Sequence, residues 1–506
     1  MRKKIPIFHS AIMLTGVNLL LRFVSTTFQV FLSRRIGAEG IGLFQLVMSV
    51  GALAMTAGMA GIRTSTMYLA AEEIGHNKRQ NVTWVLSGCI LYSISCSGII
   101  ALSLYYFAPF LAEHWIGNIH TVSAIRTYSG FLPVCCLCGV MTGYFTAANR
   151  IGTLAIVEIG EQLFSMAVTF GILILWAEDN SEKACQSVIM GSGFSAIFTL
   201  TILVILRICE KEKTGKPIAV GKRIFNIAIP LGLADNLRTG ISTAENLMVP
   251  KRLALYTAAQ SPLAAFGTVC GMVFPILMFP AAILFGLAEL LIPEFARCVA
   301  AGSKIRTKYL AMRSLRVAII YGFIFCGLEF LCAEELCTLL YRNTKAGFHL
   351  RLYALLIPVL YCDAITDAMI KGLGQQKICV RYNIITSTID LILLYILLPK
   401  YGMMGYFFSF LITHLINFVL SLRRLLKNIG NVITVGMPLK TAFAACVSIF
   451  LSINLSMPYL RISAFILIFG SMLVLLQVIK KEDIAWMKGL IRKNDLQYTY
   501  KNTTTD

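Results

Sequence analysis

Four polar side chains lie within one long apolar segment of this sequence, residues 224–249: Asp235, Arg238, Ser242 and Glu245. At about 100° per residue they fall within about 80° of one another on a helix, so they form a single polar stripe. An ionisable group at the centre of a bilayer costs about 2.5 to 3.5 kcal/mol on insertion scales, so such groups face a bundle interior or a water-filled cavity. The stripe therefore predicts a binding site or pathway for a charged molecule.

Similar polar stripes occur in other apolar segments. They comprise Asn18, Arg22, Ser25, Thr26 and Gln29 in the first segment, Glu158, Glu161, Gln162 and Ser165 in the fifth, Asp363, Thr366 and Asp367 in the tenth, and Glu289 near the end of the eighth. Any one of these residues can instead pair with a neighbour and hold two helices together. As a set, they favour a polar cavity inside a bundle.

The composition shows which elements must position these residues. The chain has 506 residues, 57% of them hydrophobic and 14% charged, which is far outside the range of soluble proteins. Apolar runs of about 20 residues, bounded by charged or Gly- and Pro-rich breaks, predict about fourteen membrane-spanning helices. Their approximate limits are 9–32, 42–69, 83–107, 124–148, 153–176, 185–207, 226–249, 263–291, 310–332, 350–370, 381–398, 402–422, 438–456 and 460–479.

Lysine and arginine are distributed unevenly among the loops. The chain has 45 Lys and Arg against 25 Asp and Glu, a net charge of +20. With both termini in the cytoplasm, roughly thirty basic residues fall in cytoplasmic segments and roughly nine in external ones, as the positive-inside rule expects. The charge thus indicates a multi-pass topology and attraction to anionic lipid headgroups. We expect no nucleic-acid binding, because no base-stacking module accompanies the charge.

Neither an enzyme nor a metal protein is expected. No loop exceeds about 25 residues, which leaves little room for an extramembrane catalytic segment. The fifteen cysteines lie mostly in the predicted spans, and no second cysteine pair or histidine cluster completes a zinc site. Helix packing is the better interpretation of these cysteines, and no cofactor is expected apart from a coupling Na⁺ or H⁺.

The sequence also indicates an internal duplication. A shift of 216 positions places Arg22 on Arg238, Thr26 on Ser242 and Gln29 on Glu245. Six spans separate the two copies, so both have the same orientation, as in parallel repeats. We therefore expect an all-α polytopic membrane protein with two pseudo-symmetric six-helix lobes and two extra C-terminal helices. The predicted domains are an N-terminal lobe (1–208), a cytoplasmic linker (209–225), a C-terminal lobe (226–424), the extra helices (437–480) and a cytoplasmic tail (481–506).

Four segments carry a family resemblance. They read LSRRIGAEGIGLFQLVMSV, MAGIRTSTMYLAAEE, MTGYFTAANRIGTLAIVEIGEQL and GMMGYFFSF, and together they resemble the stage V sporulation protein B family. That family belongs to the polysaccharide-export and lipid-flippase branch of the MOP superfamily, which also includes the MATE exporters. The resemblance implies fourteen spans in two lobes in the bacterial cytoplasmic membrane. It also implies movement of an undecaprenyl-pyrophosphate-linked sugar for peptidoglycan, spore cortex or polysaccharide, with cell-wall synthesis proteins as candidate partners.

The resemblance assigns family residues to positions in this chain. Arg22 matches an arginine of the first span, Glu161 and Gln162 match a Glu-Gln pair of the fifth, and Glu245 matches a glutamate of the seventh. The sequence departs from the family pattern at Glu289 and Glu294, which puts the chemistry of the eighth span in doubt.

These positions together predict an alternating-access site. Guanidinium groups match phosphate oxygens, so we expect Arg22 and Arg238 to bind the diphosphate, with Arg63 as a further candidate. Asn18, Gln29 and Ser242 would bind sugar hydroxyls. Asp235, Glu245, Glu161, Asp363 and Glu289 would act as counter-ions or as the coupling site.

Three alternatives stay open. A cation-coupled multidrug exporter of the same superfamily would bind amphipathic cations through acidic residues, and the arginines argue against it. A membrane glycosyltransferase would need a larger extramembrane segment. A purely structural cell-division protein would leave the buried charges unexplained.

Overall fold

The chain folds almost entirely into helices in the computed structural model, which describes residues 7–76, 78–176, 181–210, 220–256, 261–430 and 436–479. No strand occurs in these residues. The helices are α1 (Ile7–Met59), α2 (Ile62–Gly75), α3 (Arg79–Phe110), η1 (Leu111–Ile116), η2 (Ile119–Thr121), α4 (Val122–Ala147), α5 (Ile151–Trp176), α6 (Ser181–Ile208), α7 (Gly221–Leu253), α8 (Pro262–Thr268), η3 (Val269–Val273), α9 (Phe274–Leu277), α10 (Ala281–Ala300), α11 (Lys304–Leu331), α12 (Ala333–Tyr341), α13 (Thr344–Ala354), α14 (Ile357–Gly372), α15 (Gln376–Tyr401), α16 (Met403–Ile429), α17 (Gly436–Ser452) and α18 (Pro458–Leu475).

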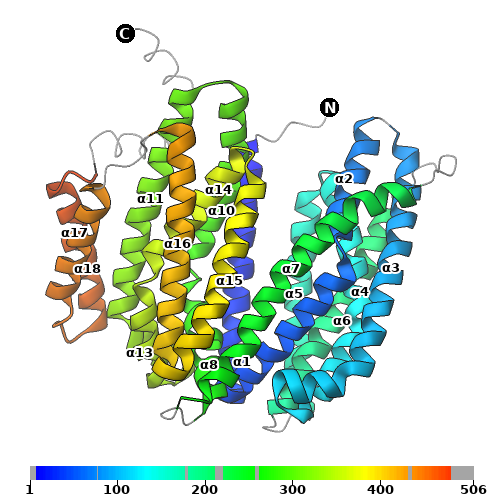
Figure 1. Cartoon of the computed structure of the whole chain (residues 1–506), viewed down its shortest axis with the longest axis horizontal. Coiled ribbons are helices and arrows are strands. Elements are labelled where there is room, and N and C mark those ends of the chain that lie inside the picture. Colours follow the sequence, from blue (N-terminus) through cyan, green and yellow to red (C-terminus); the bar gives the residue numbers. More distant parts are fainter. Residues whose placement is uncertain are drawn as a thin grey trace.

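The helices form two bundles (Figure 1). Helices α2 to α6 pack together in the first bundle, and α10 to α16 form most of the second. The bundles approach each other near α8 and diverge toward the end at which the N-terminus lies (Figure 1). The molecule is therefore shaped like a V whose apex, which we call the closed end, lies opposite the N-terminus.

Helix α1 contains two spans that meet at a sharp bend. Its 53 residues would measure about 80 Å as a straight helix, far more than the hydrocarbon core of about 30 Å. Gly37 breaks it with φ 70° and ψ −179°. A side chain at this left-handed, extended conformation would be strained, so glycine allows the chain to reverse here. The sequence prediction of two spans in this region, 9–32 and 42–69, matches this bend.

The two bundles exchange helices at the closed end. The first half of α1 runs along the second bundle, where Phe23 packs on Phe279 and Gln29 is bonded to η3. Helix α7 crosses to the first bundle and packs on α2 and the second half of α1. Small residues allow the close approach of α1 and α8. A Cβ at Gly267 would lie 1.9 Å from the carbonyl oxygen of Ala38, and one at Gly42 would lie 2.3 Å from that of Leu263.

The exchange is consistent with the proposed duplication. At the shift of 216 positions, the bend at Gly37 falls on Leu253, where α7 ends. The first half of α1 thus lies on the second bundle, although the rest of its repeat forms the first bundle. Helix α7 likewise begins on the first bundle, although the rest of its repeat forms the second. The domain limits expected from the sequence remain a prediction.

The fourteen predicted spans fall largely on helical segments. Within the described residues, nine helices are long and apolar enough to cross a membrane, and up to eleven if each bent pair is one span. The bent pairs join α8 and α9 to α10 and α13 to α14, at 62° and 53°. Helix α17 has only 17 residues, and α7 carries the charged stripe that lowers its hydropathy. The chain is an all-α, multi-span membrane protein.

Candidate functional site

The polar stripe of α7, which we call the central stripe, lies on an exposed face of the helix. Asp235, Arg238 and Ser242 are exposed, and Glu245 is half-buried. Their spacing of three or four residues keeps them on one side of α7, the helix that crosses between the bundles. On the opposite side, Thr243 is buried and donates a hydrogen bond of 3.0 Å to the carbonyl of Ser49 in α1. The helix is therefore fixed on one face and presents its charges on the other.

The polar residues predicted as one stripe on α1 do not all face the same surroundings. Arg22 is half-buried, and its Nε is enclosed without a hydrogen-bond partner. Gln29 donates through Nε2 to the carbonyl of Gly271 in η3 at 3.3 Å, so this amide group holds α1 against the second bundle. Thr26 lines an apolar groove on that bundle. The side chain of Asn18 lies outside the described residues.

The charges of the central stripe and Arg22 of α1 have no partners among the described residues. Within the described part of the chain, Arg22, Arg238, Asp235 and Glu245 make no ion pair and no side-chain hydrogen bond. One carboxylate oxygen of Glu245 is buried and unpartnered as well. Unpaired charge in a membrane protein is costly unless a ligand, an ion or water compensates it. This arrangement suits a site that waits for a charged ligand.

Charged residues at the open end of the V, by contrast, are paired with one another. Arg223, at the start of α7, lies 2.8 Å from Glu72 and 2.9 Å from Glu73, and Asn81 donates to Glu73 at 3.1 Å. We call these four residues the end cluster. They join α7 to α2 and α3, and the buried Glu73 carboxylate has a partner on both oxygens. The cluster is a structural fastening of α7 to the first bundle.

The remaining predicted site residues lie on helices other than α1 and α7, in both bundles. Arg63 is exposed on α2, and Glu158 on α5 is near enough to interact with it electrostatically. Glu161, one turn further along α5, is half-buried. In the second bundle, Glu289 is exposed on α10, and Glu294 bridges Arg297 at 3.2 Å and Arg306 at 2.8 Å. Of the two glutamates that depart from the family pattern, one thus forms surface ion pairs.

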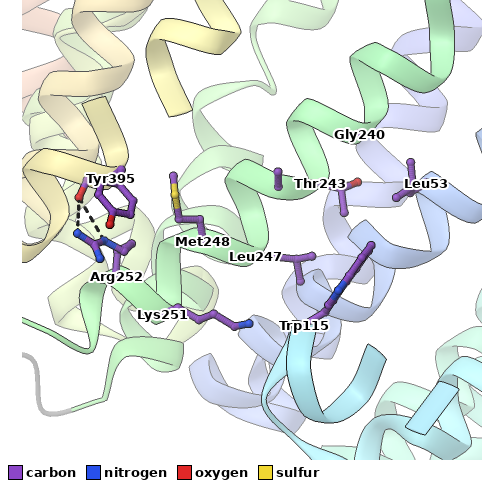
Figure 2. A pocket seen from close by; sticks show the side chains of 10 residues that line it. Leu53, Trp115, Gly240, Thr243, Leu247, Met248, Lys251, Arg252 and Tyr395 are labelled. Carbon is purple, nitrogen blue, oxygen red and sulfur yellow. Dashed lines mark hydrogen bonds between the residues drawn. The ribbon is translucent and has the colours of Figure 1, made fainter. Parts of the chain in front are cut away.

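A cavity of 380 Å³ lies at the closed end of the V, next to the central stripe. Figure 2 shows α7 along it, from Gly240 to Arg252, with Trp115 on one side and Tyr395 on the other. The guanidinium carbon of Arg252 lies 3.6 Å from the centre of the Tyr395 ring, and Nη2 donates to the Tyr395 carbonyl at 2.9 Å. Lys251 donates to the carbonyl of His114. Adjacent residues of α7 thus contact α15 in one bundle and η1 of the other.

A buried polar network in the second bundle contains residues that the sequence analysis missed. Asp363 on α14 lies 3.2 Å from His414 Nδ1 and accepts a hydrogen bond of 2.8 Å from Asn417, both on α16. On α15, Asp390 accepts from Ser409 at 2.5 Å. Glu245 of the central stripe faces Asp390 within electrostatic range. The network therefore leads from the predicted Asp363 toward the predicted Glu245.

The sequence did contain a signal for this network. Asp390 is the one charged residue between Arg381 and Lys400, and His414 and Asn417 are three positions apart on one helix face. A lone acid in an apolar span is a functional candidate by the same reasoning that selected Asp363. Within the described residues, no group of three or more His, Cys, Asp or Glu side chains is placed to hold a metal ion.

Comparisons with known proteins agree with this architecture. Residues 14–177 match the family model MatE. The chain is similar to stage V sporulation protein B of Bacillus subtilis (strain 168), with 21% identity over 416 residues, 78% of this chain and 78% of the relative. It is also 20% identical to sporulation protein YkvU of the same organism, over 72% of this chain and 82% of the relative. The first relative confirms the family resemblance expected from the sequence.

Solved structures share the fold. The lipid II flippase MurJ in an inward closed conformation aligns with a TM-score of 0.69 and 13% identity, over 91% of this chain and 98% of MurJ. A MATE multidrug resistance transporter of the MOP superfamily in an inward-facing conformation aligns with a TM-score of 0.67 and 12% identity, over 80% and 92%. The chain therefore has the fold of the MOP-superfamily transporters, as the sequence analysis expected.

Proposed function

We propose that this protein is a flippase that moves a lipid-linked sugar precursor, joined through a pyrophosphate, across the cytoplasmic membrane by alternating access. The observation that carries the proposal is the pair of unpartnered arginines, Arg22 and Arg238. They occupy matching positions on the two helices that exchange between the bundles. A substrate held between such helices would contact both halves of the molecule.

The chemistry of the substrate follows from the arginines. A pyrophosphate carries several negative charges, and a planar guanidinium group donates two parallel hydrogen bonds to phosphate oxygens. Arg22 has an enclosed, unused Nε donor, and Arg238 is exposed on the central stripe. Both arginines would bind the diphosphate, with Arg63 as a further contact. Ser242, with Asn18 and Gln29, would bind sugar hydroxyls.

The acidic residues would complete the transport cycle. Asp235 and Glu245 lie within one to two turns of Arg238 on α7 and would balance its charge when the site is empty. The Asp363 network and Glu245 would bind the coupling Na⁺ or proton, because carboxylates and neutral hydroxyl or amide oxygens are ligands for hard cations. Glu161 and Glu289 are weaker candidates for the same role.

The lipid tail has a natural place in the second bundle. An apolar groove of 480 Å³ lies between α1, α11 and α18, and Phe23, Phe279 and Ile462 are among its lining residues. A polyprenyl chain would lie in this groove or remain in the bilayer. The alignment with the lipid II flippase, which extends over a larger share of this chain than the MATE alignment does, supports a lipid substrate.

A cation-coupled multidrug exporter is the second candidate. The buried acidic network of Asp363 and Asp390 favours it, since such exporters need acidic groups for cations, and MATE structures are among the similar folds. The unpartnered arginines weigh against a cationic substrate, because like charges repel across a site of low dielectric.

Reconstitution into proteoliposomes separates the two candidates. We expect the protein to move a lipid-linked sugar diphosphate between leaflets and to leave cationic dyes untouched. Selective movement of the dyes would overturn the flippase proposal in favour of the exporter.

The orientation is part of the proposal. Both termini are placed in the cytoplasm, with the V open to that side. Reporter fusions at Arg150 and at Lys400 are expected to report cytoplasmic and external positions, respectively. The reverse result would invert the topology and the direction of transport.

A further inference from the structure

One buried acid stands alone in the apolar groove of the second bundle. Glu329 lies near the end of α11 and is 4% exposed, yet both of its carboxylate oxygens are enclosed without a hydrogen-bond partner. It lines the groove together with Phe23 and Val30 of α1 and Phe325 of α11. An ionised carboxylate without a partner costs several kcal/mol in such a place, so the group takes up a proton instead.

The charged neighbours of Glu329 are engaged elsewhere. Arg351 of α13 pairs with Glu334 at 3.2 Å, and Arg461 of α18 pairs with Glu335 at 2.8 Å. Both arginines also donate to backbone carbonyls of the same turn, those of Phe330 and Leu331. Neither is therefore available as a counter-ion for Glu329.

The other titratable groups that face this region are phenols and thiols, whose ordinary pKa values leave them uncharged at neutral pH. They are Tyr321 and Cys326 of α11, Cys337 of α12 and Tyr361 of α14. Cys332 lines the groove beside Glu329. No cationic side chain in the described part of the chain forms an ion pair with this carboxyl group, so proton binding is the remaining way to neutralise it.

The opposite wall of the groove is the helix that carries the proposed substrate arginine. Thr26 of α1 lines the groove, and Arg22 lies one helical turn before it on the same face. The first half of α1 ends at the bend at Gly37, and its last turns also touch the first bundle, where the ring of Phe31 lies 5.4 Å from that of Phe170 on α5. A shift of this half of α1 would therefore alter both the surroundings of Arg22 and the cover over Glu329.

We infer that Glu329 is a proton-binding site of the groove, which exchanges its proton when α1 uncovers it and so links protonation to the position of Arg22. The transport consequence of this inference rests on the proposed function, whereas the proton-binding site itself does not. When α1 covers the groove, the carboxyl group holds its proton. When α1 moves away, water or a lipid headgroup reaches the carboxyl group and accepts the proton.

Carbodiimide labelling tests the site without any transport. Dicyclohexylcarbodiimide is apolar and reacts with a protonated carboxyl group to give an N-acylurea, which mass spectrometry locates. In proteoliposomes we expect Glu329 to be labelled at about pH 6, where ordinary carboxyl groups are already ionised, and about tenfold less at about pH 10. Glu335, which is paired with Arg461, serves as the internal control and should stay unlabelled. Absence of label at Glu329, or label independent of pH, would overturn the inference.

The Glu329→Gln variant tests the link to transport, because it keeps the shape of the side chain and removes the exchangeable proton. Its abundance and thermal stability should match the wild type, and its transport should lose the pH dependence that the wild type shows. Glu335→Gln is the matched control and should retain that dependence. An unchanged pH profile in Glu329→Gln would refute the coupling. Failure of the wild type to move lipid-linked sugar at all would refute the proposed function and leave the labelling result standing.

Discussion

A single helix of this protein carries charge in two contrasting arrangements. In the end cluster, Arg223 of α7 lies between Glu72 and Glu73 at hydrogen-bond distance. Four turns further along the same helix, Arg238 of the central stripe has no partner. The first arrangement fastens α7 to the first bundle, and the second leaves its charge available. The contrast teaches that a charged residue within a membrane helix does not by itself indicate a binding site. A charge that already has a partner in the protein has a structural role, and a charge without a partner is a candidate for binding a ligand.

The largest expected effect comes from the unpaired arginines. Arg22→Ala and Arg238→Ala should each abolish export of a lipid-linked precursor, because each removes a charge-assisted contact to the diphosphate worth about 2 kcal/mol or more. Membrane abundance should stay at the wild-type level, since neither side chain is paired in the folded protein. Full export by both variants would show that the unpaired arginines are no more important for transport than the paired Arg223, and would contradict this prediction.

The end cluster should respond in the opposite way. Arg223→Ala leaves the buried Glu73 carboxylate without its guanidinium partner, which should lower the stability of the protein by about 1 to 3 kcal/mol. Thermal unfolding of the purified protein measures this loss. Transport per folded molecule should remain near the wild-type value. A variant that is fully stable and inactive would show that Arg223 belongs to the site.

A smaller effect is expected at the closed end of the V. Arg252→Ala removes the cation–π contact with Tyr395 and the hydrogen bond to its carbonyl, worth about 0.5 to 2 kcal/mol. The two bundles should then separate more often at that end. Spin labels on non-canonical amino acids at the exposed Glu113 and Lys345 would report a longer distance. Tyr395→Phe keeps the ring and the backbone carbonyl, so it should behave as the wild type.

The sequence predicted the positions of the helices better than it predicted which helices pack against each other. Hydropathy located the spans because lipid selects apolar residues along the whole length of a helix. It did not reveal that the first half of α1 packs on the second bundle, because that depends on the bend at Gly37. Nor did it reveal how closely the second half approaches α8 at Gly42 and Gly267. Spacing along one helix says which residues share a face, and only tertiary packing says what that face meets.

The candidate site shows the same limit. The stripe of α7 was predicted as a unit, and its residues do share an exposed face. On α1, by contrast, Gln29 is bonded to the backbone of η3 and Thr26 lines the groove. Asp390 and His414 were missed, since a single acid or histidine in a span has no pattern of its own until a neighbouring helix supplies its partner.

Binding of a lipid-linked sugar diphosphate to the protein in nanodiscs tests the central claim most directly. Two variants of α7 provide the comparison, Arg238→Ala in the central stripe and Arg223→Ala in the end cluster. We predict that Arg238→Ala weakens binding by about thirtyfold, the equivalent of about 2 kcal/mol, and that Arg223→Ala leaves the Kd within about twofold of the wild type. Equal affinities for all three proteins, or an equal loss in both variants, would contradict the account.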